Sequence, residues 1–146
     1  MNYRKWLIED LQRLESDRFA LSHIAAELET VKAEHAAIKA TNYDKMPSGS
    51  GTNTQEEKML TALAKKDELE ANLEATRRRV ESMDALLAAL PADERRVIER
   101  MYIAKESHAT ERLSEELGYE IAQIYRIKNK ALTNLAQLRH GAGYQT

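Results

Sequence analysis

The stretch ERLSEELGYEIAQIYRIKNKAL, residues 111–132, decides how this chain of 146 residues folds. Gly118 lies near its middle, and glycine adopts the left-handed backbone of a tight turn between two helices at no steric cost. Ser114 takes a position where the helices approach closely and a small side chain is needed. The spacing predicts a helix-turn-helix whose second helix begins near Glu120. Its apolar residues stand at the offsets from the turn that lock the second helix across the first: Leu113, Leu117, Tyr119, Ile124 and Ile127.

The second helix of this motif has one apolar face and one polar face. At about 100° per residue, the face predicted to lie in the core carries Ile124, Ile127, Ala131, Leu135 and Leu138. The outward face and its flanks carry Ala122, Gln123, Tyr125, Arg126, Asn129, Lys130 and Thr133. Arginine pairs with guanine O6 and N7, asparagine or glutamine pairs with adenine N6 and N7, and methyl groups contact thymine. This face therefore predicts base recognition in the major groove of double-stranded DNA.

Several residues near this face have more than one interpretation. Lys128, Lys130 and Arg139 are interpreted as phosphate contacts, which raise affinity without reading sequence. Lys128 alternatively extends its stem over apolar surface. Tyr125 either touches DNA or packs under the first helix of the domain. His108 either caps the first helix of the motif or faces solvent, or it meets a phosphate.

The distribution of charge supports DNA binding, although the formal net charge of the whole chain is −2. From Ile121 to Thr146 there are four basic residues and no acidic residue. Carboxylates are thus excluded where a polyanion would have to lie.

Ahead of this segment, the sequence predicts two long helices joined by a polar loop. The first helix runs from about Tyr3 to Lys39, and its apolar stripe is Leu7, Leu11, Leu14, Leu21, Ile24, Leu28, Val31 and Ile38. The loop TNYDKMPSGSGTNT, residues 41–54, is rich in turn formers, and Thr54 with Glu57 forms a capping-box pattern. The second helix runs to about Leu90 with the seam Leu69, Leu73, Thr76, Val80, Met83, Leu87 and Leu90. Residues 1–90 are therefore predicted to form an antiparallel helical hairpin.

Pro91 begins a further helix that is predicted to end near Ile103, because proline is tolerated at the first helical position. We place the domain boundary there, so that residues 91–146 form the DNA-binding domain. The leucines of residues 1–90 do not indicate a basic-region zipper, because only Arg4 and Lys5 precede them. The run RRR at residues 77–79 is interpreted as a solvated face.

The composition excludes several classes of protein. The few glycines and prolines and the charged fraction of 32% indicate an all-α protein. With no cysteine, a disulfide framework or a thiolate metal site is impossible. The scattered His23, His35, His108 and His140 and the lack of a phosphate loop argue against an enzyme, so we expect no cofactor and no metal. Without a signal peptide or a membrane span, a cytoplasmic location is expected.

Two segments carry a resemblance to a known family. LPADERRVIERMYI, residues 90–103, and LGYEIAQIYRIKNKALTNL, residues 117–135, resemble region 4 of bacterial sigma factors, which binds the promoter −35 element. With the preceding hairpin, the whole chain resembles the small phage and prophage late transcription regulators of the ArpU and RinA type. The resemblance implies that bases are read from the first two turns of the recognition helix, at Ile121, Ala122, Tyr125 and Arg126.

The sequence therefore leads to the hypothesis of a DNA-binding transcription regulator, an activator of phage or prophage late genes. A single small helix-turn-helix buries too little surface to select one site in a genome, so a homodimer through the hairpin or an RNA polymerase partner is expected. The alternative is a protein that binds RNA polymerase as a mimic of sigma region 4 and never reads DNA. The absence of carboxylates after Glu120 favours the first hypothesis.

Overall fold

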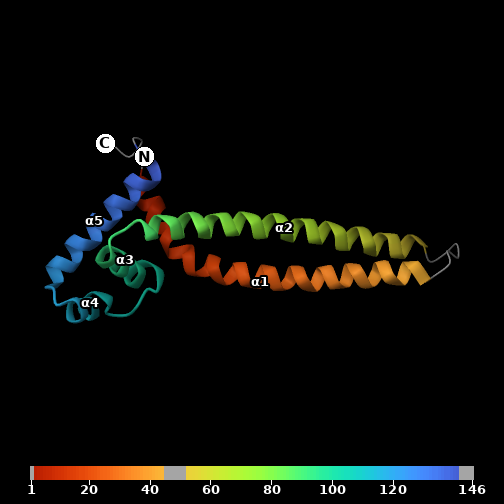
Figure 1. The fold of residues 1–146 in the computed structure, drawn as a ribbon, viewed down its shortest axis with the longest axis horizontal. Helices are drawn as coiled ribbons and strands as arrows, with labels where there is room; N and C mark the ends of the chain where they lie inside the picture. Colours follow the sequence, from red (N-terminus) through yellow and green to blue (C-terminus); the bar gives the residue numbers. More distant parts are fainter. Residues whose placement is uncertain (1, 45–51, 142–146) are drawn as a thin grey trace. The chain divides into compact units, whose positions relative to one another are not determined.

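The computed structural model describes residues 2–44 and 52–141, and these residues form helices with no strand among them (Figure 1). The expected all-α fold is thereby confirmed. The helices in chain order are α1 (Tyr3–Asp44), α2 (Thr52–Ala88), α3 (Ala92–Ile98), the π-helical segment η1 (Glu99–Ile103), α4 (Ala109–Leu117) and α5 (Ile121–His140).

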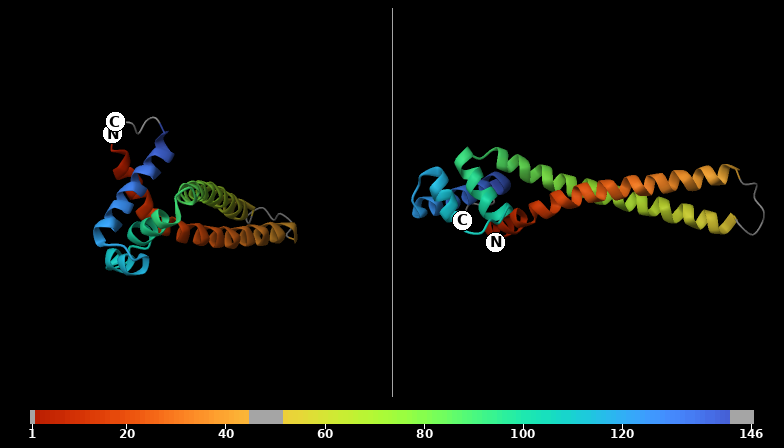
Figure 2. Two further views of the ribbon diagram at one scale, coloured as in Figure 1. Left: turned by 60° about the vertical axis from the view of Figure 1, so that its left-hand side comes forward. Right: turned by 90° about the horizontal axis from the view of Figure 1, so that it is seen from below.

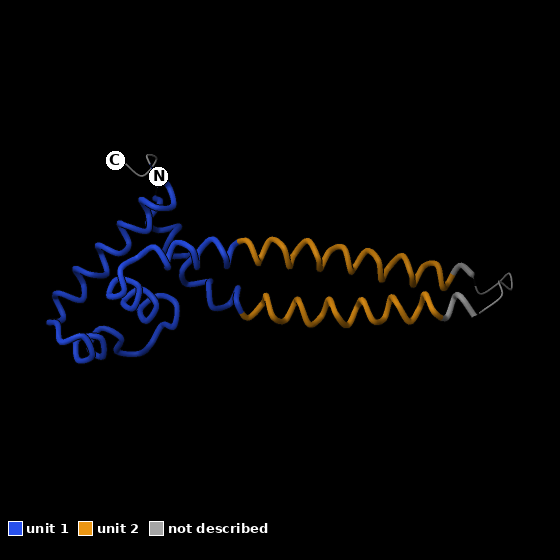
Figure 3. The backbone as a smooth tube through the Cα atoms, in the orientation of Figure 1, with its two compact units in different colours: residues 1–18, 79–146 blue, residues 19–78 orange. Residues whose placement is uncertain are grey.

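The described chain divides into two compact units (Figure 3). Unit 1 combines Met1–Arg18 with Arg79–Thr146, and unit 2 is Phe19–Arg78. The start of α1 and the end of α2 thus belong to the same unit as α3, α4 and α5.

Unit 2 consists of the α1 and α2 segments between Phe19 and Arg78, which run side by side (Figures 1 and 2). Among the side chains of unit 2 that the structure describes, Ile24, Leu28, Val31 and Thr76 are buried. Glu27 on α1 lies 3.8 Å from the Lys65 ammonium on α2, measured from Oε1 to Nζ. A pair of helices covers only one side of each helix, so other seam residues such as Leu69 and Leu73 are only half-buried.

The predicted loop, residues 41–54, is too wide at both ends. Helix α1 continues to Asp44, and α2 already begins at Thr52. Thr54 therefore lies inside α2, and its assignment as the capping residue at the helix start is wrong. Once a helix is nucleated, adding a residue gains one backbone hydrogen bond, so it extends into residues that alone would favour a turn. The middle of the predicted loop, residues 45–51, lies outside the described residues.

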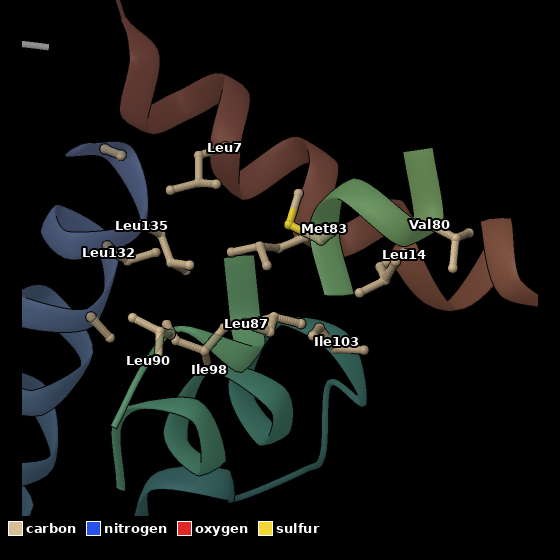
Figure 4. Close-up of a cluster of buried hydrophobic side chains, with 13 residues drawn as sticks. Leu7, Leu14, Val80, Met83, Leu87, Leu90, Ile98, Ile103, Leu132 and Leu135 are labelled. Carbon is tan, nitrogen blue, oxygen red and sulfur yellow. The ribbon is translucent and has the colours of Figure 1, made fainter. Parts of the chain in front are cut away.

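The core of unit 1 is built from four parts of the chain (Figure 4). These parts are the first turns of α1, the end of α2 with the residues just after it, the segment of α3 and η1, and the second half of α5. The buried residues of this cluster are Leu7, Leu11, Leu14, Val80, Met83, Leu87, Leu90, Ile98, Ile103, Ala131, Leu132, Leu135 and Ala136. The amino-terminal segment of α1 is thus part of the core that supports α5.

The prediction that Leu138 of α5 lies in the core is wrong, because its side chain is 51% exposed. Leu132 and Ala136 are buried instead. The buried face turns toward these two residues because α1 packs against the second half of α5, as the contact between the rings of Tyr3 and His140 at 4.4 Å shows. A helical wheel describes α5 alone, so it cannot show that α1 packs against this helix.

Candidate nucleic-acid interface

The turn between α4 and α5 is closed by Gly118, whose backbone is left-handed with a φ of 72°. Its N–H donates to the Ser114 carbonyl oxygen over 3.0 Å. The Ser114 hydroxyl in turn donates to the carbonyl oxygen of Tyr119. Glu120 is extended, with φ −66° and ψ 154°, and its carbonyl oxygen accepts the first amides of α5 from Gln123 and Ile124. This short turn fixes where α5 starts relative to α4.

A small core cluster lies beneath this turn. Val97 of α3, Leu113 of α4 and Ile124 of α5 are fully buried together. Leu117 and Ile127 pack against this cluster while remaining partly exposed. These residues hold the first half of α5 across α3 and α4.

Tyr119 departs from the expected core position, because its side chain is exposed. Its hydroxyl lies 3.3 Å from an oxygen of the Asp93 carboxylate, to which it donates. A phenol keeps its polar end at the surface when a hydrogen-bond partner is there, which explains the outward position. Tyr119 therefore ties the turn to α3 through a polar contact.

Most of the predicted DNA-binding residues lie on one broad, largely exposed face of α5. We define the α5 stripe as Ile121, Ala122, Gln123, Tyr125, Arg126, Asn129 and Lys130. All are exposed except Gln123, which is half-buried; Ile121 and Tyr125 are 46% and 45% exposed, large fractions for apolar and aromatic side chains. The structure thus brings the predicted readers together on one face. It places Lys128, half-buried, at the edge of this face.

Tyr125 and Lys128 contact each other. The Lys128 ammonium lies 5.0 Å from the centre of the Tyr125 ring, within the range of a cation–π interaction. Tyr125, 45% exposed and beside the Lys128 ammonium, therefore faces outward rather than packing under the first helix of the domain.

Two amides of the stripe accept hydrogen bonds from arginines. Arg126 Nη1 lies 3.2 Å from Gln123 Oε1, one helical turn away. Arg4 Nη2, from the first turn of α1, lies 2.6 Å from Asn129 Oδ1. Arg4 is the residue that sequence reasoning missed, because nothing in the sequence indicates that the start of α1 reaches α5.

Ion pairs fix the elements around the interface. Arg100 of η1 pairs with Glu106 over 2.8 Å and with Glu116 of α4, and its hydrogen bonds to these two carboxylates raise its pKa. Burial raises the pKa of the neighbouring Tyr102, while the positive charge of Arg4 acts in the opposite direction. Arg139 pairs with Asp10 of α1, so its charge is already matched within unit 1.

The remaining candidates are less central. His108 precedes α4 in a left-handed conformation with a φ of 57°, is exposed and makes no side-chain capping bond.

Within residues 2–44 and 52–141, no group of three or more histidine and acidic side chains is arranged to hold a metal ion. In the same ranges, no helix has an apolar stretch long enough to cross a bilayer.

Comparison of the chain with family models gives no match, and comparisons with curated proteins and with solved structures find none that is similar.

Proposed function

We propose that this chain is a sequence-specific DNA-binding transcription regulator, in which α4 and α5 form a helix-turn-helix and α5 is the recognition helix. The observation that carries the proposal is the α5 stripe itself. An isoleucine, a tyrosine, an arginine and an asparagine lie exposed on one helix face, outside the buried clusters of unit 1. Each of these side chains has a known partner on base edges or phosphates in the major groove.

Charge supports the same conclusion. Helix α5 carries Arg126, Lys128 and Lys130 and no carboxylate, and Arg4 adds a further positive charge beside Asn129. A surface that binds only protein has no reason to exclude carboxylates over this length, whereas a surface facing phosphates does. This difference favours DNA binding over binding to RNA polymerase alone.

A regulator of this size needs help to find its site, since one small reading helix gives little specificity. We propose that α1 and α2 form a helical hairpin that mediates self-association or contact with RNA polymerase. Phe19, Leu60 and Leu63 of unit 2 are exposed, and exposed large apolar residues are typical of such contact surfaces. The resemblance to phage and prophage late regulators suggests activation at promoters as the outcome.

The experiment is DNA binding by the full chain to upstream DNA from its own gene cluster at two salt concentrations. Arg126→Ala should weaken binding to the specific site by about 1–3 kcal/mol and leave nonspecific binding less affected. The control is Arg78→Ala, which removes an exposed arginine of unit 2 that is paired with Glu74.

Equal weakening by both variants would contradict base reading by Arg126. If the wild-type chain binds no promoter fragment but co-purifies with RNA polymerase, the proposal is wrong and the polymerase-binding function replaces it.

A further inference from the structure

The two amide side chains of the α5 stripe are both held in a known orientation. An arginine has only hydrogen-bond donors, so the atom of an amide that faces it must be the oxygen. Arg4 therefore occupies Asn129 Oδ1 at 2.6 Å, and Arg126 occupies Gln123 Oε1 at 3.2 Å. Each oxygen keeps a second lone pair, but the bond to the arginine fixes which way the amide faces, and the NH₂ group, which can only donate, is the end away from the arginine.

The charged side chains of the stripe also only donate. Arg126 and Lys130 carry no acceptor, and no carboxylate follows Glu120, which lies before the first turn of α5. Apart from the two amide oxygens held by arginines, the Tyr125 hydroxyl is the one side-chain group of the α5 stripe that can accept a hydrogen bond. From Gln123 to Lys130 this surface is therefore almost entirely a row of hydrogen-bond donors.

Bases differ in what they offer to such a row. In the major groove, guanine presents two acceptors, N7 and O6, whereas adenine presents the acceptor N7 beside the donor N6 amino group. An asparagine selects adenine only when its oxygen accepts from N6 while its NH₂ donates to N7. At Asn129 the oxygen already accepts a short bond from a charged donor, a stronger kind than one between neutral groups, so it would have to turn toward N6 against that bond or share itself between Arg4 and N6.

We propose that the α5 stripe selects guanine over adenine at the bases facing Gln123 and Asn129, and that Arg4 sets this preference at Asn129 by holding its side-chain oxygen. The inference rests on the proposed function, namely that α5 reads DNA. It reverses the simple expectation that an asparagine and a glutamine on this face pair with adenine. Arg4 acts here as a positioning residue from a different helix.

Arg4 is suited to this role because it is itself held in place. Its side chain is half-buried where the start of α1 meets α5. Its positive charge also acts on the hydroxyl of Tyr102. The first turn of α1 is anchored beside it by the buried Leu7 and by the contact between the Tyr3 and His140 rings. The guanidinium therefore does not have to be ordered when DNA binds.

The test begins with selection of binding sites from a random DNA duplex library by the full-length chain at one salt concentration. Guanine should be enriched on one strand. Replacing a selected guanine by 7-deazaguanine, which lacks the N7 acceptor, should weaken binding about tenfold. Replacing the same guanine by inosine, which keeps N7 and O6, should leave affinity within about twofold. These measurements need no change to the protein.

Two variants then test Arg4. Arg4→Met should reduce the preference for guanine over adenine at one position from about tenfold to about twofold, since the oxygen of Asn129 is released. Lys5→Met is the matched control, because it removes an exposed neighbouring charge and should weaken binding to all sequences equally. Circular dichroism checks that both variants keep their helix content.

Three results would overturn the inference, and they differ from one another. Enrichment of adenine by the wild-type chain contradicts the row of hydrogen-bond donors. Equal guanine preference in the two variants contradicts the role of Arg4. Both results leave DNA recognition itself intact. A wild-type chain that selects no sequence at all refutes the proposed function as well.

Discussion

Replacing Leu11 by alanine should destabilise unit 1, although Leu11 is more than a hundred residues away from α5 in the sequence. Its side chain is 0% exposed and lies in the cluster that contains Leu132 and Leu135. Leu11→Ala removes three carbon atoms from this core, which costs about 2.4 kcal/mol at roughly 0.8 kcal/mol for each buried carbon. The cavity left behind brings the expected loss to about 3–4 kcal/mol, within the range of such replacements in well-packed cores.

The single tryptophan makes this loss measurable in unit 1 alone. Trp6 lies on the first turns of α1, 47% exposed, with the Tyr3 ring edge-on at 5.6 Å between ring centres. Its fluorescence during urea unfolding should therefore report when α1 leaves the core. The midpoint for Leu11→Ala should fall well below that of the wild type.

Leu138→Ala is the matched control, because it makes the same chemical change at a site that is 51% exposed on α5. We expect it to lower the free energy of unfolding by less than about 1 kcal/mol. Equal midpoints for the two variants would refute the packing of the α1 start against α5, and with it the route by which Arg4 reaches Asn129.

Two further predictions concern the turn and the surface of α2. Gly118→Ala should lower the free energy of unfolding by about 1–2 kcal/mol, as measured by thermal unfolding, because an alanine is strained at the left-handed φ of 72°. A steric clash adds nothing to this loss, since a Cβ at this position meets no atom within 4 Å. An unchanged stability would mean that the turn adopts another backbone conformation. Glu74 accepts hydrogen bonds from Arg77 and Arg78, which lower its pKa. Its contribution to stability should therefore be present above the usual glutamate pKa and be lost as the pH falls through the lowered value. NMR titration should show Glu74 ionising below the usual glutamate range, and Arg77→Met should move its pKa back toward that range; an unchanged pKa in the variant would contradict the assignment.

The sequence predicts the features that depend on local spacing. The helical class, the turn at Gly118 and the start of α5 after Glu120 follow from periodicity and from the special backbone freedom of glycine. The outward position of Arg126 follows in the same way, because a helix repeats about every 3.6 residues whatever lies around it.

Features that depend on a distant partner were not predictable. The helical wheel of α5 predicts that Leu138 lies in the core, because a wheel of one helix cannot show that α1 covers a different side of it. In the sequence, Arg4 is only a basic residue ahead of a leucine series, since its contact with Asn129 joins residues 125 positions apart. Tyr119 fits an apolar spacing, but the partner of its hydroxyl, Asp93, comes from a separate helix.

The discontinuity of unit 1 has a consequence for how the protein is made. Leu11 and Leu132 meet in one core, yet about 120 residues separate them in the chain. At roughly 5–20 residues per second, a ribosome needs on the order of 10 s between the two, and during that time the leucines of α1 lack their final neighbours. The residues of unit 2 are synthesised in between, and they can bury their own apolar side chains first. Because α5 is the last of the described helices to be synthesised, the core of unit 1 is complete only after α5 has been made.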